Sequence, residues 1–303
     1  MSLLDSMTIS DVARHLRMSW HTIKEMDRAY LGKKYGKMRL CDLRYLAIDE
    51  IAYKKGHRYK TIVYDLEGRK AVYVGQGRSI ESLAPFLQRL KDSGARIKAI
   101  ATDMWPPYWG SVQKHLPDTE VVFDLFHIIK QLSKTIDDIR SSVYGQEKDK
   151  TQRKLIKGSR WLLLKNRENL RTEPGSAGKS EKQRLEELME LNTPLSQAYI
   201  LKEQLKQVWE RGIGVREANQ RLKNWIEDAR GMGVKAMDRF CNQLTSHRKG
   251  ILNWHKSQIS TGPLEGFNNK IKVLKRSAYG FTDDEYFNLR ILALHEYRYA
   301  LLR

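Results

Sequence analysis

The sequence predicts an α/β protein with a strand-rich first part and a long helical second part. From Leu43 to Val74, apolar residues recur mainly at every second position, which is the period of β-strands. From Ile128 to about His255 they recur every three or four positions, as in amphipathic helices. The chain has 303 residues, of which 41% are hydrophobic. It is therefore long enough to bury a sizeable core and to form two subdomains.

Basic residues outnumber acidic residues along the whole chain. Lys and Arg number 55 against 36 Asp and Glu, so the net charge is +19. Such a field favours a polyanion, and nucleic acid is the usual one. No apolar run approaches the ~18 residues of a membrane-spanning helix, and no secretory leader is visible. Cys41 and Cys241 are too far apart to indicate a zinc knuckle or a disulfide framework. We expect a protein of the reducing cytoplasm with no membrane partner.

Residues 1–40 predict a small helix-turn-helix followed by a basic linker. The stretch from Met7 to Tyr30 has the pattern of two short helices. A small residue at Ala13, an apolar turn residue at Met18 and an apolar residue at Ile23 match the spacing of a helix-turn-helix.

The second of these helices is the expected DNA-binding element. Ser19 is a good N-cap for it. The side chains that we expect to be exposed and to contact phosphates or base edges are Trp20, His21, Lys24 and Arg28. The alternative is an ordinary helical hairpin packed on the core. Gly32 to Arg39 is expected to form the linker.

The first predicted strand, Leu46 to Tyr53, carries an acid in an apolar row. Asp49 shares one strand face with Ala47 and Ile51, and a lone carboxylate there is costly unless it is paired or bound to a metal. Two more strands, Tyr59 to Leu66 and Lys70 to Val74, complete an antiparallel meander. The Gly75-Gln76-Gly77 segment that follows is a weak signal for phosphate binding, and a plain strand-to-helix turn is the preferred interpretation.

A fourth strand, Ile97 to Asp103, ends on a second acid, and a fifth, Thr119 to Phe126, carries Asp124 with His127 just beyond. Helices beginning near Ser79 and at Pro106 separate them. Three strands, a helix, a strand, a helix and a strand is the order of an RNase H-like sheet, in which strands one and four are neighbours. Asp49 and Asp103 are then expected to converge on one metal site. The alternatives are that Asp49 pairs with a basic residue and that Asp103 is a turn residue or a helix cap.

Residues 128–257 are predicted to be entirely helical. We expect the tryptophans of this block to anchor its core, and stacking on nucleic acid stays open for one of them. They are Trp161, Trp209, Trp225 and Trp254.

The stretch from Ile259 to Arg276 predicts a helix that starts at Gly262 and Pro263. Its apolar stripe is expected to face a core, and it consists of Leu264, Phe267, Ile271 and Leu274. A second face holds one carboxylate beside an amide and two cations, which suits a metal ion with phosphate oxygens alongside: Glu265, Asn269, Lys272 and Arg276. The alternative is a solvated helix with polar pairs one turn apart.

Four segments of the chain together resemble the ISL-three family of bacterial insertion-sequence DDE transposases. They are Ala47-Ile48-Asp49-Glu50, Ala101-Thr102-Asp103-Met104, Asp124-Leu125-Phe126-His127 and Gly262-Pro263-Leu264-Glu265-Gly266-Phe267-Asn268-Asn269-Lys270-Ile271-Lys272, and the resemblance extends through Lys275 to Phe281. It implies an RNase H-like catalytic core over residues 41–127 and 258–303, interrupted by an all-helical insertion at 128–257. The family usually has a zinc-binding segment with paired cysteines before the helix-turn-helix, and this sequence starts without one.

The resemblance also implies a catalytic site. Asp49, Asp103 and Glu265 match the catalytic, metal-binding acids of the family, and Asp124, His127 and Asn269 are expected to support them. Two Mg²⁺ or Mn²⁺ ions are the implied cofactors. The implied partner is double-stranded DNA, both transposon ends and target, bound by a homodimer that associates with the nucleoid. Contacts to the phosphate backbone are expected from Lys272, Lys275 and Arg276.

Two other functions remain open from the sequence. A truncated or domesticated transposase would bind DNA without catalysis, through the helix-turn-helix and the positive charge. An RNase H-like nuclease would use the same metal site without strand transfer. The three acids favour an enzyme, because a protein that only binds DNA does not need them.

Overall fold

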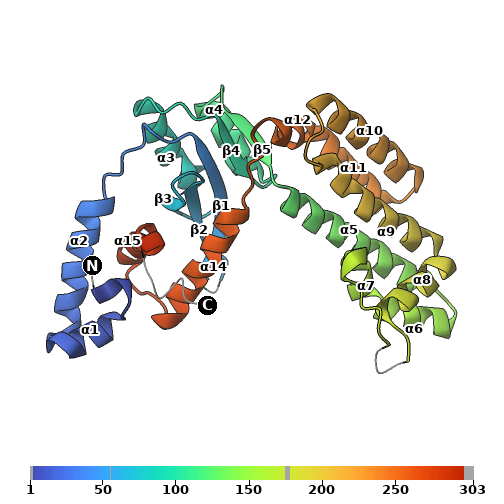
Figure 1. Ribbon diagram of the computed structural model, residues 1–303, viewed down its shortest axis with the longest axis horizontal. Helices are drawn as coiled ribbons and strands as arrows, with labels where there is room; N and C mark the ends of the chain where they lie inside the picture. Colours follow the sequence, from blue (N-terminus) through green and yellow to red (C-terminus); the bar gives the residue numbers. More distant parts are fainter. Residues whose placement is uncertain (1–2, 55, 175–177, 297–303) are drawn as a thin grey trace. The chain divides into compact units, whose positions relative to one another are not determined.

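The computed structural model describes residues 3–54, 56–174 and 178–296. The chain forms two compact units, which can be followed along the sequence in Figure 1. The first, the sheet unit, comprises Met1–Asp124 and Ile259–Arg303, and the second, the helical unit, comprises Leu125–Gln258. The helical unit lies close to the bounds expected for the insertion, 128–257. The two helices of residues 1–40 belong to the sheet unit.

The sheet unit is built on a five-stranded mixed sheet. Its strands are β1 (Tyr45–Lys54), β2 (Arg58–Asp65), β3 (Lys70–Gln76), β4 (Ala99–Thr102) and β5 (Glu120–Phe123). Their order is β3-β2-β1-β4-β5; the β1–β2 and β2–β3 pairs are antiparallel, and the β1–β4 and β4–β5 pairs are parallel. The prediction that the first and fourth strands are neighbours is confirmed.

Two strands are shorter than predicted. β4 ends at Thr102 and β5 ends at Phe123, so Asp103 and Asp124 follow their strands instead of lying within them. His127 lies in helix α5 (Leu125–Gln146). The pairing explains the difference, because the β4–β5 ladder ends at the Thr102–Phe123 pair and the chain then leaves the sheet.

Helices cover both faces of the sheet. On one face, α14 (Gly262–Ser277) and α15 (Asp284–Ala293) share a core with β1, β2 and β3. On the other face, α3 (Ile80–Asp92) and α4 (Pro106–His115) meet Thr61 of β2, whose hydroxyl hydrogen-bonds Ser82 of α3 at 2.9 Å and Tyr108 of α4 at 3.0 Å. The short helix η4 (Leu294–Glu296) follows α15. The predicted last helix reached Tyr299, and its residues from 297 lie outside the described part of the chain.

The predicted helix-turn-helix is present as α1 (Ile9–Leu16) and α2 (Trp20–Tyr35), after a short helix η1 (Leu3–Asp5). The Ser19 hydroxyl accepts a hydrogen bond from the backbone of Thr22 at 3.1 Å, which confirms Ser19 as the N-cap of α2. Ala13 and Ile23 are buried together between the two helices. α2 is longer than predicted and continues to Tyr35, because Leu31 and Tyr35 are buried in the core of the sheet unit. The expected linker from Gly32 is therefore helical in its first part.

The helical unit follows the predicted pattern. Its longer helices are α5 (Leu125–Gln146), α6 (Lys150–Gly158), α8 (Glu181–Leu191), α9 (Thr193–Leu205), α10 (Val215–Gly231) and α11 (Lys235–Ser246). Short helices lie between and after them: α7 (Arg160–Leu164), η2 (Arg167–Asn169), η3 (Lys206–Trp209), α12 (Arg248–Leu252) and α13 (Trp254–Ser257). In the described ranges, 3–54, 56–174 and 178–296, no helix is long and apolar enough to cross a membrane.

The tryptophans of the helical unit differ from one another. Trp209 and Trp225 are buried core anchors, as predicted, and the Trp225 indole donates a hydrogen bond to the carbonyl of Leu201 at 2.8 Å. Trp161 is 68% exposed, so its prediction as a core residue is wrong. It lies on the short helix α7, beside the guanidinium of Arg160. Stacking on a nucleobase requires an exposed ring. Of Trp161, Trp209 and Trp225, only Trp161 has one.

Candidate functional site

Asp49 lies on the face of β1 that α14 covers. Ala47 and Ile51, two residues before and after it, are buried in one core cluster with Phe267 of α14. Side chains alternate along a strand, so Asp49 points toward the same helix. There the Nδ2 atom of Asn268 donates a hydrogen bond to its Oδ2 atom at 2.9 Å. From the sequence, Asp49 could also have paired with a basic residue. Its hydrogen-bond partner on α14 is instead the amide of Asn268.

The carboxyl group of Asp49 is electrostatically coupled to the other two predicted acids. Burial raises the pKa of Asp49 to about 6, and the negative charges of Asp103 and Glu265 act in the same direction. A backbone hydrogen bond and the amide of Asn268 oppose this rise. Charges act on a partly buried group in this way only from nearby, so Asp103 and Glu265 are each close enough to Asp49 to affect its pKa.

Asp103 reaches this environment because of the strand register. In the parallel pair of β1 and β4, Ala47 is opposite Ala101. Asp49 and Asp103 each follow two residues later, so they lie at the same level of the sheet, Asp49 within β1 and Asp103 just after β4. One carboxylate oxygen of Asp103 accepts a hydrogen bond from the backbone of Trp105 at 3.1 Å. Asp103 therefore has the contact of a turn residue, which was one of the alternatives. This contact uses one carboxylate oxygen and is compatible with a place in the catalytic site.

Glu265 lies in the first turn of α14 and is exposed. The predicted apolar stripe of this helix is confirmed, because its four residues are all buried: Leu264, Phe267, Ile271 and Leu274. Pro263 lies in the first turn, where its missing N–H costs nothing. An acid near a helix N-terminus is also favoured by the helix dipole. The stripe packs α14 on the sheet and leaves Glu265 on the side from which it acts on Asp49.

The ligand chemistry of these acids fits a hard divalent cation. Three carboxylates supply the oxygen ligands that Mg²⁺ and Mn²⁺ prefer. In the described ranges, however, no three His, Cys, Asp or Glu side chains are already close enough to hold one metal ion.

Asp124, predicted to support the site, binds the segment that leads into α14. It is buried, and its Oδ2 atom accepts hydrogen bonds from the backbone N–H and the hydroxyl of Thr261, both at 2.5 Å. Thr261 is the N-cap residue of α14. His127, the other predicted supporting residue, lies in α5 of the helical unit, where its ring packs beside that of Phe126.

The amide that contacts the site is Asn268 and not the predicted Asn269. Asn268 is 5% exposed and bonded to Asp49, whereas Asn269 is exposed and accepts a hydrogen bond from Lys272 at 3.0 Å. The choice of Asn269 rested on its place in the polar face of the helix. Asn268 lies between that face and the apolar stripe, four residues after Leu264, and a polar residue at such a boundary was the signal to follow.

The basic residues predicted to contact DNA lie along α14. Lys272 and Arg276 are exposed, and Lys275 is partly exposed. The last turn of α14 carries Lys275 and Arg276, where cations are favoured by the helix dipole. The same helix therefore presents an acid at its start and a line of cations toward its end.

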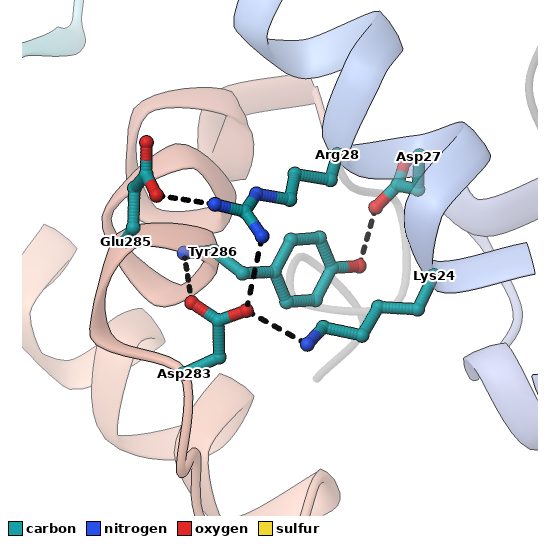
Figure 2. A network of polar contacts seen from close by, with 6 residues as sticks. All are labelled: Lys24, Asp27, Arg28, Asp283, Glu285 and Tyr286. Carbon is teal, nitrogen blue, oxygen red and sulfur yellow. Dashed lines mark hydrogen bonds and ion pairs between the residues drawn. The ribbon is translucent and has the colours of Figure 1, made fainter. Parts of the chain in front are cut away.

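Two of the four residues of α2 predicted to contact DNA bind acids of the α15 segment (Figure 2). The Nζ atom of Lys24 donates a hydrogen bond to Asp283 at 2.7 Å, and Arg28 is bonded to Glu285 and lies 3.8 Å from Asp283. The side chain of Lys24 is only 16% exposed, so the prediction that it is exposed is wrong. The helical period of α2 identifies one face, but it does not reveal which segment far along the chain covers that face.

A buried group lies beneath these ion pairs. Asp27 of α2 accepts hydrogen bonds from the Tyr286 hydroxyl at 2.5 Å and from Arg290 at 3.0 Å, and all three residues are buried. Figure 2 shows Tyr286 lying between the two helices. The alternative of a helical hairpin packed on the core therefore describes this side of α2. Trp20 and His21 remain exposed, and their contact with DNA stays a prediction.

A family model and a similar transposase show the family of this chain. The family model of the ISL3-type DDE transposases, whose description is "Transposase", matches residues 46–291. The transposase for insertion sequence element IS1001 of Bordetella parapertussis is 40% identical over 296 residues, which are 96% of this chain and 70% of the relative. The transposase for insertion sequence element IS1557 of Mycobacterium tuberculosis is 27% identical over 294 residues, 89% of this chain and 64% of the relative. Among solved structures, the Drosophila P element transposase strand transfer complex is similar over 87% of this chain and 80% of that chain, with 11% identity and a TM-score of 0.46.

An α/β sheet with acids beside neighbouring strands and a basic helix is typical of an enzyme that acts on nucleic acid. The chain belongs to the ISL3-type family of DDE transposases, and it is a DNA transposase of an insertion sequence. Transposases of this family depend on a divalent metal ion.

Proposed function

We propose that this transposase cleaves DNA at the ends of its insertion sequence and joins them to target DNA at a site formed by Asp49, Asp103 and Glu265. The observation that carries this proposal is the environment of Asp49, where burial raises its pKa to about 6 and the negative charges of Asp103 and Glu265 act in the same direction. The strand order, with β4 parallel to β1, supports an RNase H-like core for this site. Mg²⁺ or Mn²⁺ is the proposed cofactor, as two ions.

Each acid has a separate role in this proposal. Asp49 would be the ligand common to both ions, and Asp103 and Glu265 would each hold one. The bound ions would neutralise charge on the attacking and leaving oxygens of the phosphodiester. With its pKa near 6, Asp49 is mainly ionised at pH 7 and above, which is the form that binds cations.

The DNA is held by the basic face of α14. Lys272, Lys275 and Arg276 contact the phosphate backbone and align the scissile phosphate with Glu265 at the start of the same helix and with the two aspartates beside it. Trp20 and His21, on the exposed part of α2, provide a second contact. Because two transposon ends are joined to one target, we propose that two copies of the chain act together on DNA.

The test compares the chain with its Glu265→Gln variant on a supercoiled plasmid that carries the element's ends, in Mg²⁺, Mn²⁺ or EDTA. We expect nicked and joined products only with a metal ion. The variant should lose at least about 100-fold in rate, because loss of a ligand exceeds the 10–100-fold effect of losing an outer-shell partner. Glu227→Gln, an exposed acid on α10 of the helical unit, is the matched control and should leave the rate unchanged.

The outcomes separate the alternatives. Cleavage by Glu265→Gln at the parent rate would show that Glu265 is not a ligand. Nicking without joined products would indicate a nuclease. DNA binding by the parent chain without either product would favour the non-catalytic DNA-binding protein.

A further inference from the structure

Two hydrogen-bonded contacts hold α14, one on each side of Glu265. Thr261, four residues before Glu265, is bonded to Asp124, and Asn268, three residues after it, is bonded to Asp49. Residues at these spacings lie on one side of a helix. The side of α14 that carries Glu265 is therefore attached to the sheet at both ends of a two-turn segment.

The two acids that hold the helix belong to strands on either side of β4. Asp49 is on β1 and Asp124 follows β5, and β4 lies between these strands with Asp103 at its end. The seven residue-to-residue steps from Thr261 to Asn268 rise about 10 Å at ~1.5 Å each. Two strand spacings of ~4.8 Å also amount to about 10 Å. The helical segment therefore has about the length that separates β5 from β1, and Glu265 lies between its two attached residues.

Both contacts have the burial that a rigid attachment needs. Asn268 is 5% exposed, Thr261 is 2% exposed and Asp124 is 4% exposed. A hydrogen bond to a carboxylate is worth more than one between neutral groups, and breaking it in a buried place leaves a polar group without a partner. These contacts therefore fix both the rotation and the position of α14 on the sheet.

We propose that Asn268 and Thr261 are positioning residues that place Glu265 opposite Asp49 and Asp103. This inference rests on the proposed function, because it assumes that these three acids hold the divalent ions. Asn268 also fixes the side chain of Asp49, since its amide occupies one carboxylate oxygen, Oδ2. Asp124 acts through Thr261 and does not need to touch an ion.

The test measures binding of Mn²⁺ to the full chain without DNA, from the electron paramagnetic resonance signal of the free ion. Asn268→Leu keeps the size of the side chain and removes its amide, and we expect it to weaken Mn²⁺ binding about 10–100-fold, as loss of an outer-shell partner does. Thr261→Val removes the hydroxyl bond to Asp124 and should weaken binding in the same direction. Thr261→Ser keeps the hydroxyl and should bind like the parent chain.

Two controls make the result specific. Val273→Ala, at an exposed position of α14, should leave Mn²⁺ binding unchanged. Thermal unfolding of each variant shows whether a loss of affinity comes from loss of the fold. If Asn268→Leu is unfolded at the assay temperature, the comparison of Thr261→Val with Thr261→Ser decides the question.

The failure of this inference differs from the failure of the proposed function. If the parent chain and Glu265→Gln bind Mn²⁺ equally, the acids are not the ligands and the proposed function is wrong. If Glu265→Gln loses binding but folded Asn268→Leu and Thr261→Val bind like the parent chain, the positioning role alone is overturned.

Discussion

At the scale of single residues, Gly75 and Gly77 are required for different physical reasons. A Cβ atom on Gly75 would lie 2.1 Å from the carbonyl oxygen of Ser82 and 2.9 Å from the ring of Tyr73. Gly77 has open space around it but a φ of +88°, which side chains with a Cβ rarely adopt. Close packing and a left-handed turn explain both glycines, so this segment does not require a phosphate ligand. The preference for a plain strand-to-helix turn agrees with this geometry.

We predict that Gly75→Ala destabilises the chain. The obstructing atom is a backbone oxygen, which also accepts a hydrogen bond from Tyr73 at 3.0 Å, so β3 and α3 must move apart. The expected cost is about 1–3 kcal/mol in the free energy of unfolding, measured by urea titration. Gly110→Ala is the control, because Gly110 lies in α4 with open space around it. It should stabilise by up to about 1 kcal/mol, and an equal effect of both changes would contradict this explanation.

At the scale of elements, α2 is both part of the helix-turn-helix and a support of the sheet unit. One side of it carries Asp27, Leu31 and Tyr35 into the core, and its ion pairs reach Asp283 and Glu285. A helix held in this way has a fixed position relative to α14. The exposed residues Trp20 and His21, which we propose contact DNA, therefore lie on a helix that is attached to the core of the sheet unit.

The contact between α2 and the start of α15 should depend on pH through Asp283. The hydrogen bond from Lys24 and the backbone N–H of Tyr286 lower the pKa of Asp283 below its usual value. A lowered folded-state pKa means that the ionised carboxylate contributes stability above the unfolded pKa of ~3.9. This contribution is lost as the pH falls through the folded-state pKa.

Asp283→Asn tests this contribution without removing the helix cap. Asp283 is the N-cap of α15, and asparagine is an equally good N-cap, so the change removes mainly the ion pairs. We expect a loss of up to about 1 kcal/mol at pH 7, measured by urea unfolding, that shrinks below about pH 4. Asp118→Asn, an exposed loop residue, should have no effect at either pH. A loss that stays constant between pH 7 and pH 3 would contradict the electrostatic explanation.

At the scale of the whole molecule, the net charge of +19 makes binding to DNA dependent on salt. The structure divides the cations into two groups, those that face solvent and those already neutralised by acids. Lys272 and Arg276 of α14 belong to the first group, and Lys24 belongs to the second. Only cations of the first group displace counterions from DNA without first breaking an internal ion pair.

We predict that Lys272→Ala and Arg276→Ala each reduce the slope of log K against log salt by about 1, because each removes one phosphate contact. Lys24→Met should leave this slope unchanged while it lowers the free energy of unfolding. Fluorescence anisotropy of labelled DNA at several salt concentrations gives the slopes. A reduced slope for Lys24→Met would show that Lys24 leaves Asp283 when DNA binds.

Much of the fold could be predicted because local patterns carry it. The period of two located the strands of the meander, the N-cap Ser19 and the first-turn proline Pro263 located two helix starts, and the apolar stripe of α14 identified its buried face. Local patterns did not locate the ends of β4 and β5. The β4–β5 ladder stops at Phe123, and only pairing between segments distant in sequence sets that end.

What the sequence determined by itself is the set of elements, their order and the acids that stand beside them, because helix and strand periods and helix caps are local properties of the chain. Tertiary structure alone decided that Asn268, and not Asn269, meets Asp49, that Asp124 holds Thr261, and that α15 covers Lys24. Each of these contacts joins residues more than a hundred positions apart. A local pattern identifies a polar residue and its face on a helix, but its partner depends on how the sheet and helices pack.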